Sequence, residues 1–187
     1  MRPAAHGKTM TLAEFQAWKP ETDGWKYEWN NGSVEVNETA VNSSEKGILN
    51  AMIRAFTRTV HFEEGWMYLD VRLSMAKQGA EKQDVIRIAD LVYFTEQQYN
   101  SFKRNGHPVP SFIAEVVHPH DFPKAATNKI VEYFQAGVQC VWLIYPEKER
   151  VRVYTSTDGS ILVRGNGVCS GYPALPDFSL TPNQLFA

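Results

Sequence analysis

Three short apolar runs between residues 86 and 145 constrain the fold more than any other feature of the chain. They read IRIADLVYF, SFIAEVV and QCVWLIY, are rich in β-branched and aromatic residues, and are bounded by turn or cap signals. Each run therefore predicts a buried β-strand. Between the last two, the sequence predicts a helix that Asp121 caps and Gly137 ends. This strand–helix–strand unit, from Phe112 to Tyr145, should be parallel with a right-handed crossover.

Three further helices are predicted from caps and apolar periodicity. They cover residues 11–19, opened by a capping box of Thr11 and Glu14, residues 44–61, and a short stretch from Thr95 to Gly106.

Alternating residues and turn signals predict the remaining strands. They form a hairpin over 25–39 turned at Asn31-Gly32, a strand over 66–75, and a hairpin over 151–165 turned at Asp158-Gly159. A polar loop should follow the strand over 66–75, and residues 171–186 should form an irregular tail. The sequence thus predicts an α/β fold with a central mixed β-sheet flanked by helices.

The length and composition indicate one globular domain over residues 1–187, with a polar leader at 1–10. The chain is 43% hydrophobic and 21% charged, which excludes a disordered protein. Its formal net charge of -2 excludes a protein that binds nucleic acid mainly through bulk positive charge. Any contact with nucleic acid must be local or bridged by metal ions.

A cytoplasmic location is expected from the cysteines and from the absence of targeting signals. Cys140 lies in an apolar run and reads as a buried free thiol, while Cys169 lies in a glycine-rich loop, so a reducing compartment fits best. The leader is too polar for a signal peptide, and no apolar run approaches the length of a membrane span.

Two acidic residues inside the apolar runs are the strongest indication of function. Asp90 lies in IRIADLVYF and Glu115 in SFIAEVV, where an ionised carboxylate is costly unless a partner neutralises it. Lys129 follows on the next helix, fourteen residues after Glu115, with Tyr133 at i+4 on the same helix face. Adjacent strands carrying Asp90 and Glu115 could hold one Mg²⁺ or Mn²⁺, with the Val116 carbonyl as a further ligand. Lys129 could then orient a water or stabilise charge on phosphorus.

Other interpretations of the same residues stay open at this point. Asp90 and Glu115 could be members of a buried ion pair, and Lys129 could be an ordinary solvated lysine. Glu28 is either a further carboxylate at the edge of the site or a strand residue on the wet face. The spacing of His118 and His120 is that of a possible metal-binding pair, although a place at the mouth of a cleft or in solvent fits them better.

The order and spacing of these motifs resemble the PD-(D/E)xK nuclease superfamily and, more narrowly, the Uma-two family of restriction-endonuclease-like proteins. The resemblance runs through TMTLAEFQAW, YEWNNGSVEV, IADLVYF, FIAEVVHPHD and NKIVEYFQAGVQCVWLIYP. It implies a restriction-endonuclease-like fold, with the nuclease aspartate at Asp90 and the glutamate at Glu115. The superfamily lysine would fall on Val117, but in this family it has moved to the helix, where Lys129 matches it. Tyr27 and Glu28 match a family hairpin.

The chain departs from the family pattern at several positions. Ala89 replaces the proline before the aspartate, His118 a serine after the glutamate strand, and Glu45 a histidine near the start of the long helix. Ala125 and Tyr145 replace two family aspartates. Because Asp90, Glu115 and Lys129 are all present, these departures bear on substrate handling more than on metal binding.

The resemblance implies a metal-dependent phosphodiesterase, expected to be a DNA endonuclease that uses Mg²⁺ or Mn²⁺. In that reading Glu28 supports Asp90, Glu115 and Lys129, and a homodimer is expected by analogy with nucleases that pair their sites. Polar and basic residues recur every four positions on the long helix, at Lys46, Asn50, Arg54 and Arg58. They could contact the phosphates of a DNA backbone, or they could simply form the solvated face of the helix. The alternatives are an inactive nuclease-fold module that binds nucleic acid or a protein, and a hydrolase of small phosphoesters.

Overall fold

The computed structural model describes residues 3–38, 43–76, 84–104, 107–118 and 123–187. The predicted cap at Asp121, the helix end at Gly106, the loop after residue 76 and His120 fall outside these ranges or depend on residues that do. Within them, no helix combines the length and apolar character needed to cross a membrane.

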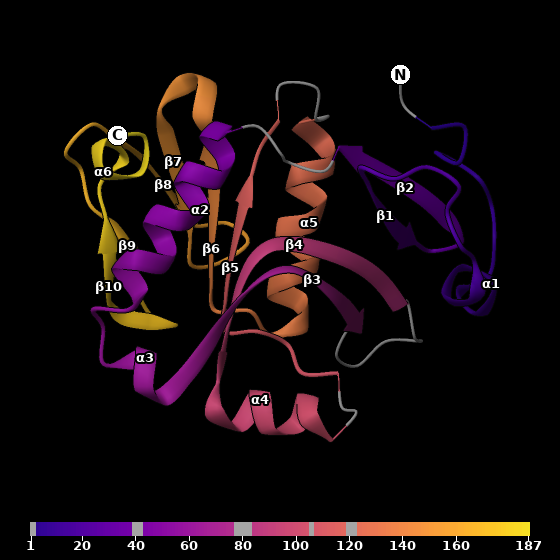
Figure 1. Ribbon diagram of the computed structural model, residues 1–187, viewed down its shortest axis with the longest axis horizontal. Helices are drawn as coiled ribbons and strands as arrows, with labels where there is room; N and C mark the ends of the chain where they lie inside the picture. Colours follow the sequence, from indigo (N-terminus) through magenta and orange to yellow (C-terminus); the bar gives the residue numbers. More distant parts are fainter. Residues whose placement is uncertain (1–2, 39–42, 77–83, 105–106, 119–122) are drawn as a thin grey trace.

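An eight-stranded mixed sheet forms the centre of the molecule, with helices on both faces (Figure 1). Its order is β2-β1-β4-β5-β6-β7-β8, and β3 pairs with β4 along its length. The strands are β1 (Trp25–Asn30), β2 (Ser33–Glu38), β3 (Gly65–Ala76), β4 (Asp84–Thr95), β5 (Phe112–Val116), β6 (Cys140–Tyr145), β7 (Arg150–Tyr154) and β8 (Ser160–Arg164). The helices are α1 (Leu12–Ala17), α2 (Ser43–Phe56), α3 (His61–Glu64), α4 (Glu96–Lys103), α5 (Pro123–Ala136) and α6 (Pro182–Leu185), with one 3₁₀ turn at Pro146–Lys148. The predicted α/β fold class is confirmed.

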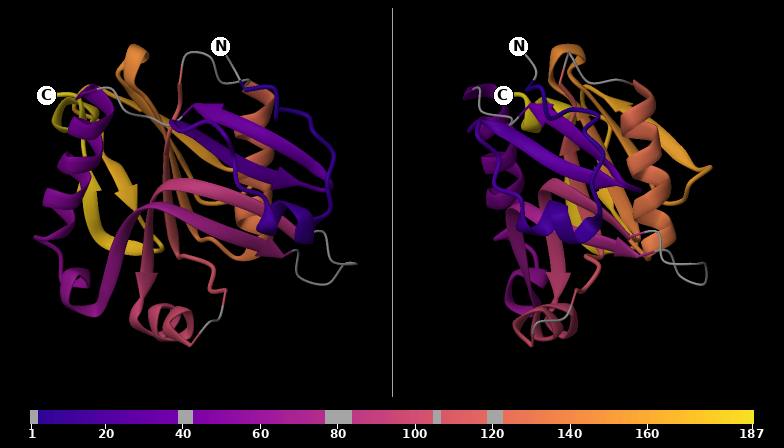
Figure 2. Two further views of the ribbon diagram at one scale, coloured as in Figure 1. Left: turned by 45° about the vertical axis from the view of Figure 1, so that its right-hand side comes forward. Right: turned by 90° about the vertical axis from the view of Figure 1, so that its right-hand side faces the viewer.

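Helices α2 and α5 cover opposite faces of the sheet, which Figure 2 shows from two further directions. Alternate residues of β4 and β5 divide between two hydrophobic clusters, because successive strand side chains point to opposite faces. Leu91 and Ala114 pack with α2, whereas Val92 and Ile113 pack with Ile130 of α5. The β5–α5–β6 unit is parallel, as predicted, so α5 starts beyond the end of β5 that carries Glu115.

The hairpin of β1 and β2 extends the sheet on one side and has a small core of its own. Asn31 and Gly32 both have positive φ, 47° and 92°, which matches the predicted Asn-Gly turn. Phe15 of α1 packs against Tyr27 and Trp29 on one face of β1. The other face of β1, which carries Lys26 and Glu28, is turned toward β4 and α5.

Strand β4 has two different neighbours on the edge that β3 leaves available. At one end β1 pairs with it, through Trp29↔Ile86 and Asn30↔Val85. At the other end β5 pairs with it, from Leu91↔Ala114 to Tyr93↔Phe112. Residues 87–90 lie between these two pairings, and in the described chain no strand is paired with them on this edge. The candidate site is built in this interval.

Three sequence predictions were wrong in detail. The helix predicted to reach His61 ends at Phe56, because β-branched residues follow and the hydroxyls of Thr57 and Thr59 donate to backbone carbonyls at 2.9 and 2.8 Å. The tail predicted to be irregular over residues 171–186 contains β10 (Leu175–Leu180) and then α6. Strand β10 pairs with β9 (Cys169–Gly171), so Cys169 lies in a strand and not in the predicted glycine-rich loop. Phe178 of β10 is buried and stacks on Trp142, with ring centroids 5.3 Å apart, so this segment belongs to the core.

Replacing Phe178 tests whether the C-terminal strand is part of the core. Phe178→Ala should lower the free energy of unfolding by about 3–5 kcal/mol, because a fully buried ring leaves a cavity. Urea unfolding followed by circular dichroism measures the loss. Tyr172→Ala in the same segment is the matched control: this side chain is exposed, so the change should stay within about 0.5 kcal/mol. Equal losses for the two variants would contradict the packing described.

Candidate active site

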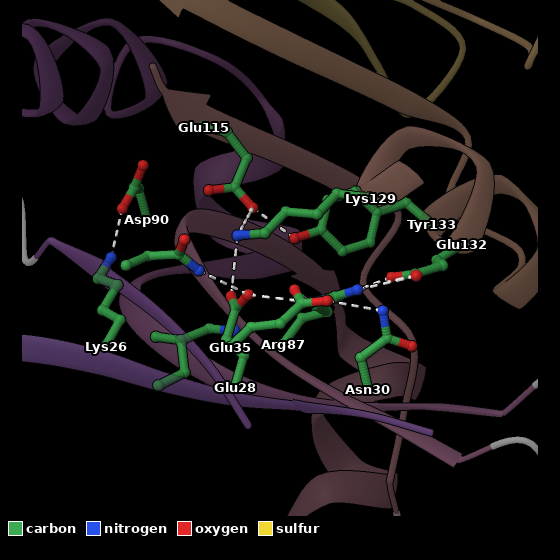
Figure 3. A network of polar contacts seen from close by, with 12 residues as sticks. Lys26, Glu28, Asn30, Glu35, Arg87, Asp90, Glu115, Lys129, Glu132 and Tyr133 are labelled. Carbon is green, nitrogen blue, oxygen red and sulfur yellow. Dashed lines mark hydrogen bonds and ion pairs between the residues drawn. The ribbon is translucent and has the colours of Figure 1, made fainter. Parts of the chain in front are cut away.

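Glu28 lies at the centre of a buried polar network between β1, β4 and α5 (Figure 3). Its carboxylate accepts four hydrogen bonds: from the backbone N–H of Ile88 at 2.9 Å, Arg87 at 3.1 Å, Asn37 at 3.0 Å and Lys129 at 2.8 Å. The side chain is completely buried. The four donors provide the hydrogen bonds that a buried carboxylate needs.

Arg87 provides the counter-charge for Glu28 and for two other carboxylates. It also donates to Glu35 of β2 and, through two nitrogens at 2.6 and 2.8 Å, to Glu132 of α5. Its side chain is 1% exposed. Burial lowers the pKa of Arg87, but the bonds to Glu132 and Glu28 outweigh burial, so its pKa is raised. Through these ion pairs the guanidinium of Arg87, on β4, links the β1–β2 hairpin to α5.

Asp90 lies at the end of the interval 87–90 of β4 that pairs with neither β1 nor β5, and each of its carboxylate oxygens accepts a hydrogen bond. Oδ2 accepts the backbone N–H of Val116 at 2.7 Å, so Asp90 replaces a missing ladder bond between β4 and β5. Oδ1 accepts the ammonium of Lys26, which also contacts Asp70 of β3 at 2.7 Å. Asp90 is 5% exposed, so the ammonium contributes much of its charge compensation.

Glu115 lies beside Asp90, and α5 supplies its partners. The β4–β5 register pairs Leu91 with Ala114, so one step further places Asp90 opposite Glu115. The hydroxyl of Tyr133 donates to Oε1 of Glu115, and Nζ of Lys129 is 3.7 Å from the same oxygen. Figure 3 shows the lysine between Glu115 and Glu28.

The pKa shifts follow from burial and from this crowding of carboxylates. Burial raises the pKa of Glu115 to about 7; Asp90 and Glu28 add to the rise, and Lys129 and Tyr133 oppose it. Burial lowers the pKa of Lys129, but Glu115 and Glu28 outweigh it and the net shift is upward. Lys129 therefore stays an ammonium at neutral pH, whereas Glu115 titrates near neutrality.

Asp90, Glu115, Lys129 and Glu28, which the sequence singled out, lie between β1, β4, β5 and α5 in two sets of polar contacts. Asp90 contacts Lys26, whereas Lys129 contacts both Glu28 and Glu115, with Tyr133 bonded to Glu115. Their roles in catalysis or metal binding stay predictions. Sequence reasoning missed Lys26, Arg87 and Glu132. Two signals were present: Arg87 is a second charged residue in the same apolar run as Asp90, and Lys26 shares a β1 face with Glu28 by alternation.

The oxygen donors at Asp90 and Glu115 fit a hard divalent cation. Mg²⁺ typically takes one or two protein carboxylates and keeps several waters. The N–H and C=O of one strand residue point to the same edge, so the Val116 carbonyl faces the edge where its N–H meets Asp90. Among the described residues, no group of three His, Cys, Asp or Glu side chains is placed to hold a metal ion. An ion at this site would therefore have Asp90 and Glu115 as its side-chain ligands.

His118 lies next to this region but has its own partner. Its Nδ1 is 2.9 Å from Oε1 of Glu45, a buried residue at the start of α2. Two of the five positions where the chain departs from the family pattern, His118 and Glu45, thus contact each other.

Comparison with known proteins identifies the family. The family model Uma2, described as "Putative restriction endonuclease", matches residues 12–183, which is nearly the whole chain. The chain belongs to the Uma2 family. This confirms the resemblance seen in the sequence and places Asp90, Glu115 and Lys129 inside the matched region.

A solved structure agrees with the Uma2 assignment at the level of the fold. A protein of Anabaena variabilis, described as "a putative nuclease belonging to DUF820", superposes with a TM-score of 0.76 at 19% sequence identity. The match covers 95% of this chain and 97% of that one. No curated protein matches the chain.

Arg87→Met should strongly destabilise the protein. The substitution leaves Glu28 without its guanidinium and removes the partner of Glu132, and breaking a buried pair costs about 3–5 kcal/mol. Denaturant unfolding measures the loss. The exposed Arg164 is the matched control, and Arg164→Met should change the free energy of unfolding by no more than about 0.5 kcal/mol. An Arg87 variant as stable as the wild type would rule out the bridging role.

Glu115 should make stability fall as the pH rises toward neutrality in the absence of metal. Its folded-state pKa of about 7 lies above the ordinary 4.5, so between these values the folded protein holds a proton that the unfolded chain releases. The stabilisation is full below pH 4.5 and is lost through pH 7, by up to about 3 kcal/mol. Unfolding in EDTA between pH 4 and 8 should show that this slope is absent in Glu115→Gln. The same slope in both proteins would contradict the raised pKa.

Proposed function

We propose that the protein is a metal-dependent phosphodiesterase, and specifically a DNA endonuclease. The observation that carries this proposal is the meeting of Asp90 and Glu115 on paired strands with the ammonium of Lys129 beside them. Membership of the Uma2 family supports a nuclease activity in general. The metal and the DNA substrate are inferred from the chemistry of the site.

The charge balance of the network supports a divalent cation. The ion pairs join three cations, Lys26, Arg87 and Lys129, to six carboxylates, Glu28, Glu35, Asp70, Asp90, Glu115 and Glu132. With all of them ionised the formal charge is 3 − 6 = −3. Burial raises the pKa of Glu115, and the neighbouring carboxylates of Asp90 and Glu28 add to the rise. We propose Mg²⁺ or Mn²⁺, held by Asp90, Glu115 and the Val116 carbonyl. The bound ion would polarise the phosphoryl group and lower the pKa of a coordinated water.

Lys129 and Tyr133 of α5 both contact Glu115, and we propose that they assist the reaction there. Lys129 is 3.7 Å from Oε1 of Glu115, so its ammonium can contact a phosphate oxygen or a water held at that carboxylate. There it would stabilise the negative charge that develops during hydrolysis. Glu28 fixes the ammonium at 2.8 Å, and Tyr133 orients the Glu115 carboxylate. Glu28 thus acts as a positioning residue.

Local positive charge would bind the DNA backbone. Lys46 and Arg54 are exposed on α2, and Arg58 is exposed just beyond its end. Lys46 follows Glu45, whose carboxylate is 2.9 Å from His118, three residues after Glu115 in the chain. We propose phosphate contacts along this stripe, and a homodimer that cuts both strands of a duplex.

One observation favours an inactive nuclease-fold module as the second candidate. Both oxygens of Asp90 already bind groups of the protein, and Glu28 accepts four hydrogen bonds, so the network also serves the fold. A module of this kind would keep the network and bind nucleic acid or a protein without cutting.

Cleavage assays separate the two candidates. Purified protein with Mg²⁺ or Mn²⁺ should cut supercoiled, linear or single-stranded DNA, and EDTA should stop the reaction. Asp90→Asn and Glu115→Gln should abolish cleavage, and Lys129→Met should lower the rate roughly 100-fold or more while the protein still binds Mn²⁺.

Two exposed residues provide controls. Lys148→Met removes an exposed lysine, and Asn128→Ala changes the exposed residue beside Lys129, so both variants should cut like the wild type. DNA that stays intact at every salt concentration tested, with Mn²⁺ bound, would favour the inactive module.

A further inference from the structure

Among the residues that the structure describes, Lys26 is the cation that contacts Asp90. It lies on β1, its side chain is 8% exposed, and its ammonium reaches Oδ1 of Asp90 and Oδ1 of Asp70. No motif in the sequence had pointed to it. Lys26 therefore contacts a carboxylate that would also be a ligand of the proposed metal ion.

The geometry makes Oδ1 the oxygen of Asp90 whose protein partner can be exchanged for a metal ion. Oδ2 accepts the N–H of Val116 and so joins β4 to β5, and giving up that bond would leave a buried backbone donor unpaired. Oδ1 is the oxygen that Lys26 occupies. Two cations on one oxygen in a buried site repel each other strongly, so a metal ion and Lys26 compete there.

Asp70 offers Lys26 an alternative partner. It lies opposite Asp90 on β3, between the pairs Leu69↔Leu91 and Val71↔Ala89. Its side chain is 61% exposed, and its contact with Lys26 is already 2.7 Å long. The ammonium can therefore leave Asp90 and keep an ion pair at the solvent edge without moving β1.

We propose that Lys26 is a built-in counter-cation for Asp90, which a divalent metal ion displaces onto Asp70. This inference rests on the proposed metal site and adds its regulation: Lys26 stabilises the metal-free protein and weakens metal binding, whereas Asp70 eases the exchange. Metal affinity is then set by two residues that are not themselves metal ligands.

Calorimetric titration with Mn²⁺ alone tests the exchange. Lys26→Met removes the competitor, so Mn²⁺ should bind about 10-fold more tightly than to the wild type, a change that corresponds to about 1.4 kcal/mol. Asp70→Asn removes the alternative partner, so Mn²⁺ should bind several-fold more weakly. Lys26→Arg keeps the charge and should leave affinity near that of the wild type. Lys19→Met, at an exposed position, is the matched control.

A double variant separates the exchange from a general loss of negative charge. If Asp70 acts through Lys26, then Asp70→Asn should have no effect on Mn²⁺ affinity once Lys26 is methionine. If Asp70→Asn weakens binding equally in both backgrounds, the proposed exchange is wrong.

Thermal unfolding gives a second readout that does not depend on activity. In EDTA the Lys26→Met variant should melt at a lower temperature than the wild type, because Asp90 loses its counter-charge. Saturating Mn²⁺ should raise its melting temperature by more than that of the wild type. Should Lys26→Met fail to fold without metal, Lys26→Arg and Asp70→Asn still carry the test.

Two negative results can be told apart. Mn²⁺ that binds neither the wild type nor any variant would overturn the metal site itself and this inference with it. Mn²⁺ that binds the wild type, and binds Lys26→Met no more tightly, would overturn the role of Lys26 alone.

Discussion

The structure depends on two carboxylates that take the place of backbone partners along β4. Strands β1 and β5 pair with opposite ends of the same β4 edge and leave residues 87–90 between them. Glu28 accepts the N–H of Ile88, and Asp90 accepts the N–H of Val116. Buried backbone donors need partners, so these two side chains allow the sheet to part at this point without leaving donors unpaired.

Parting the sheet creates the space that the candidate site uses. Continuous pairing of β4 would have filled the interval with main chain, whereas the gap admits side chains from β1, β5 and α5. The same carboxylates that satisfy the backbone then need cations, which Lys26, Arg87 and Lys129 provide. Fold and candidate function therefore share the same side chains, which serve stability as well as the proposed chemistry.

Much of the fold could be predicted from local signals. The capping box at Thr11, the Asn31-Gly32 turn and the strand–helix–strand unit depend on neighbours in sequence, and all three are present. The C-terminal strands could not be predicted in the same way. Phe178 becomes a core residue only because Trp142, remote in sequence, provides a surface for it to stack on.

The candidate site shows the same division. The sequence by itself determined that Asp90 and Glu115 are buried acids on strands and that Lys129 follows on a helix, because apolar periodicity reports burial and spacing reports element order. Only the tertiary structure decided which cation meets which carboxylate: Lys26 with Asp90, Arg87 with Glu28 and Glu132, and Lys129 between Glu28 and Glu115. These partners lie up to 101 residues apart, and local patterns carry no information on the register between such distant strands and helices.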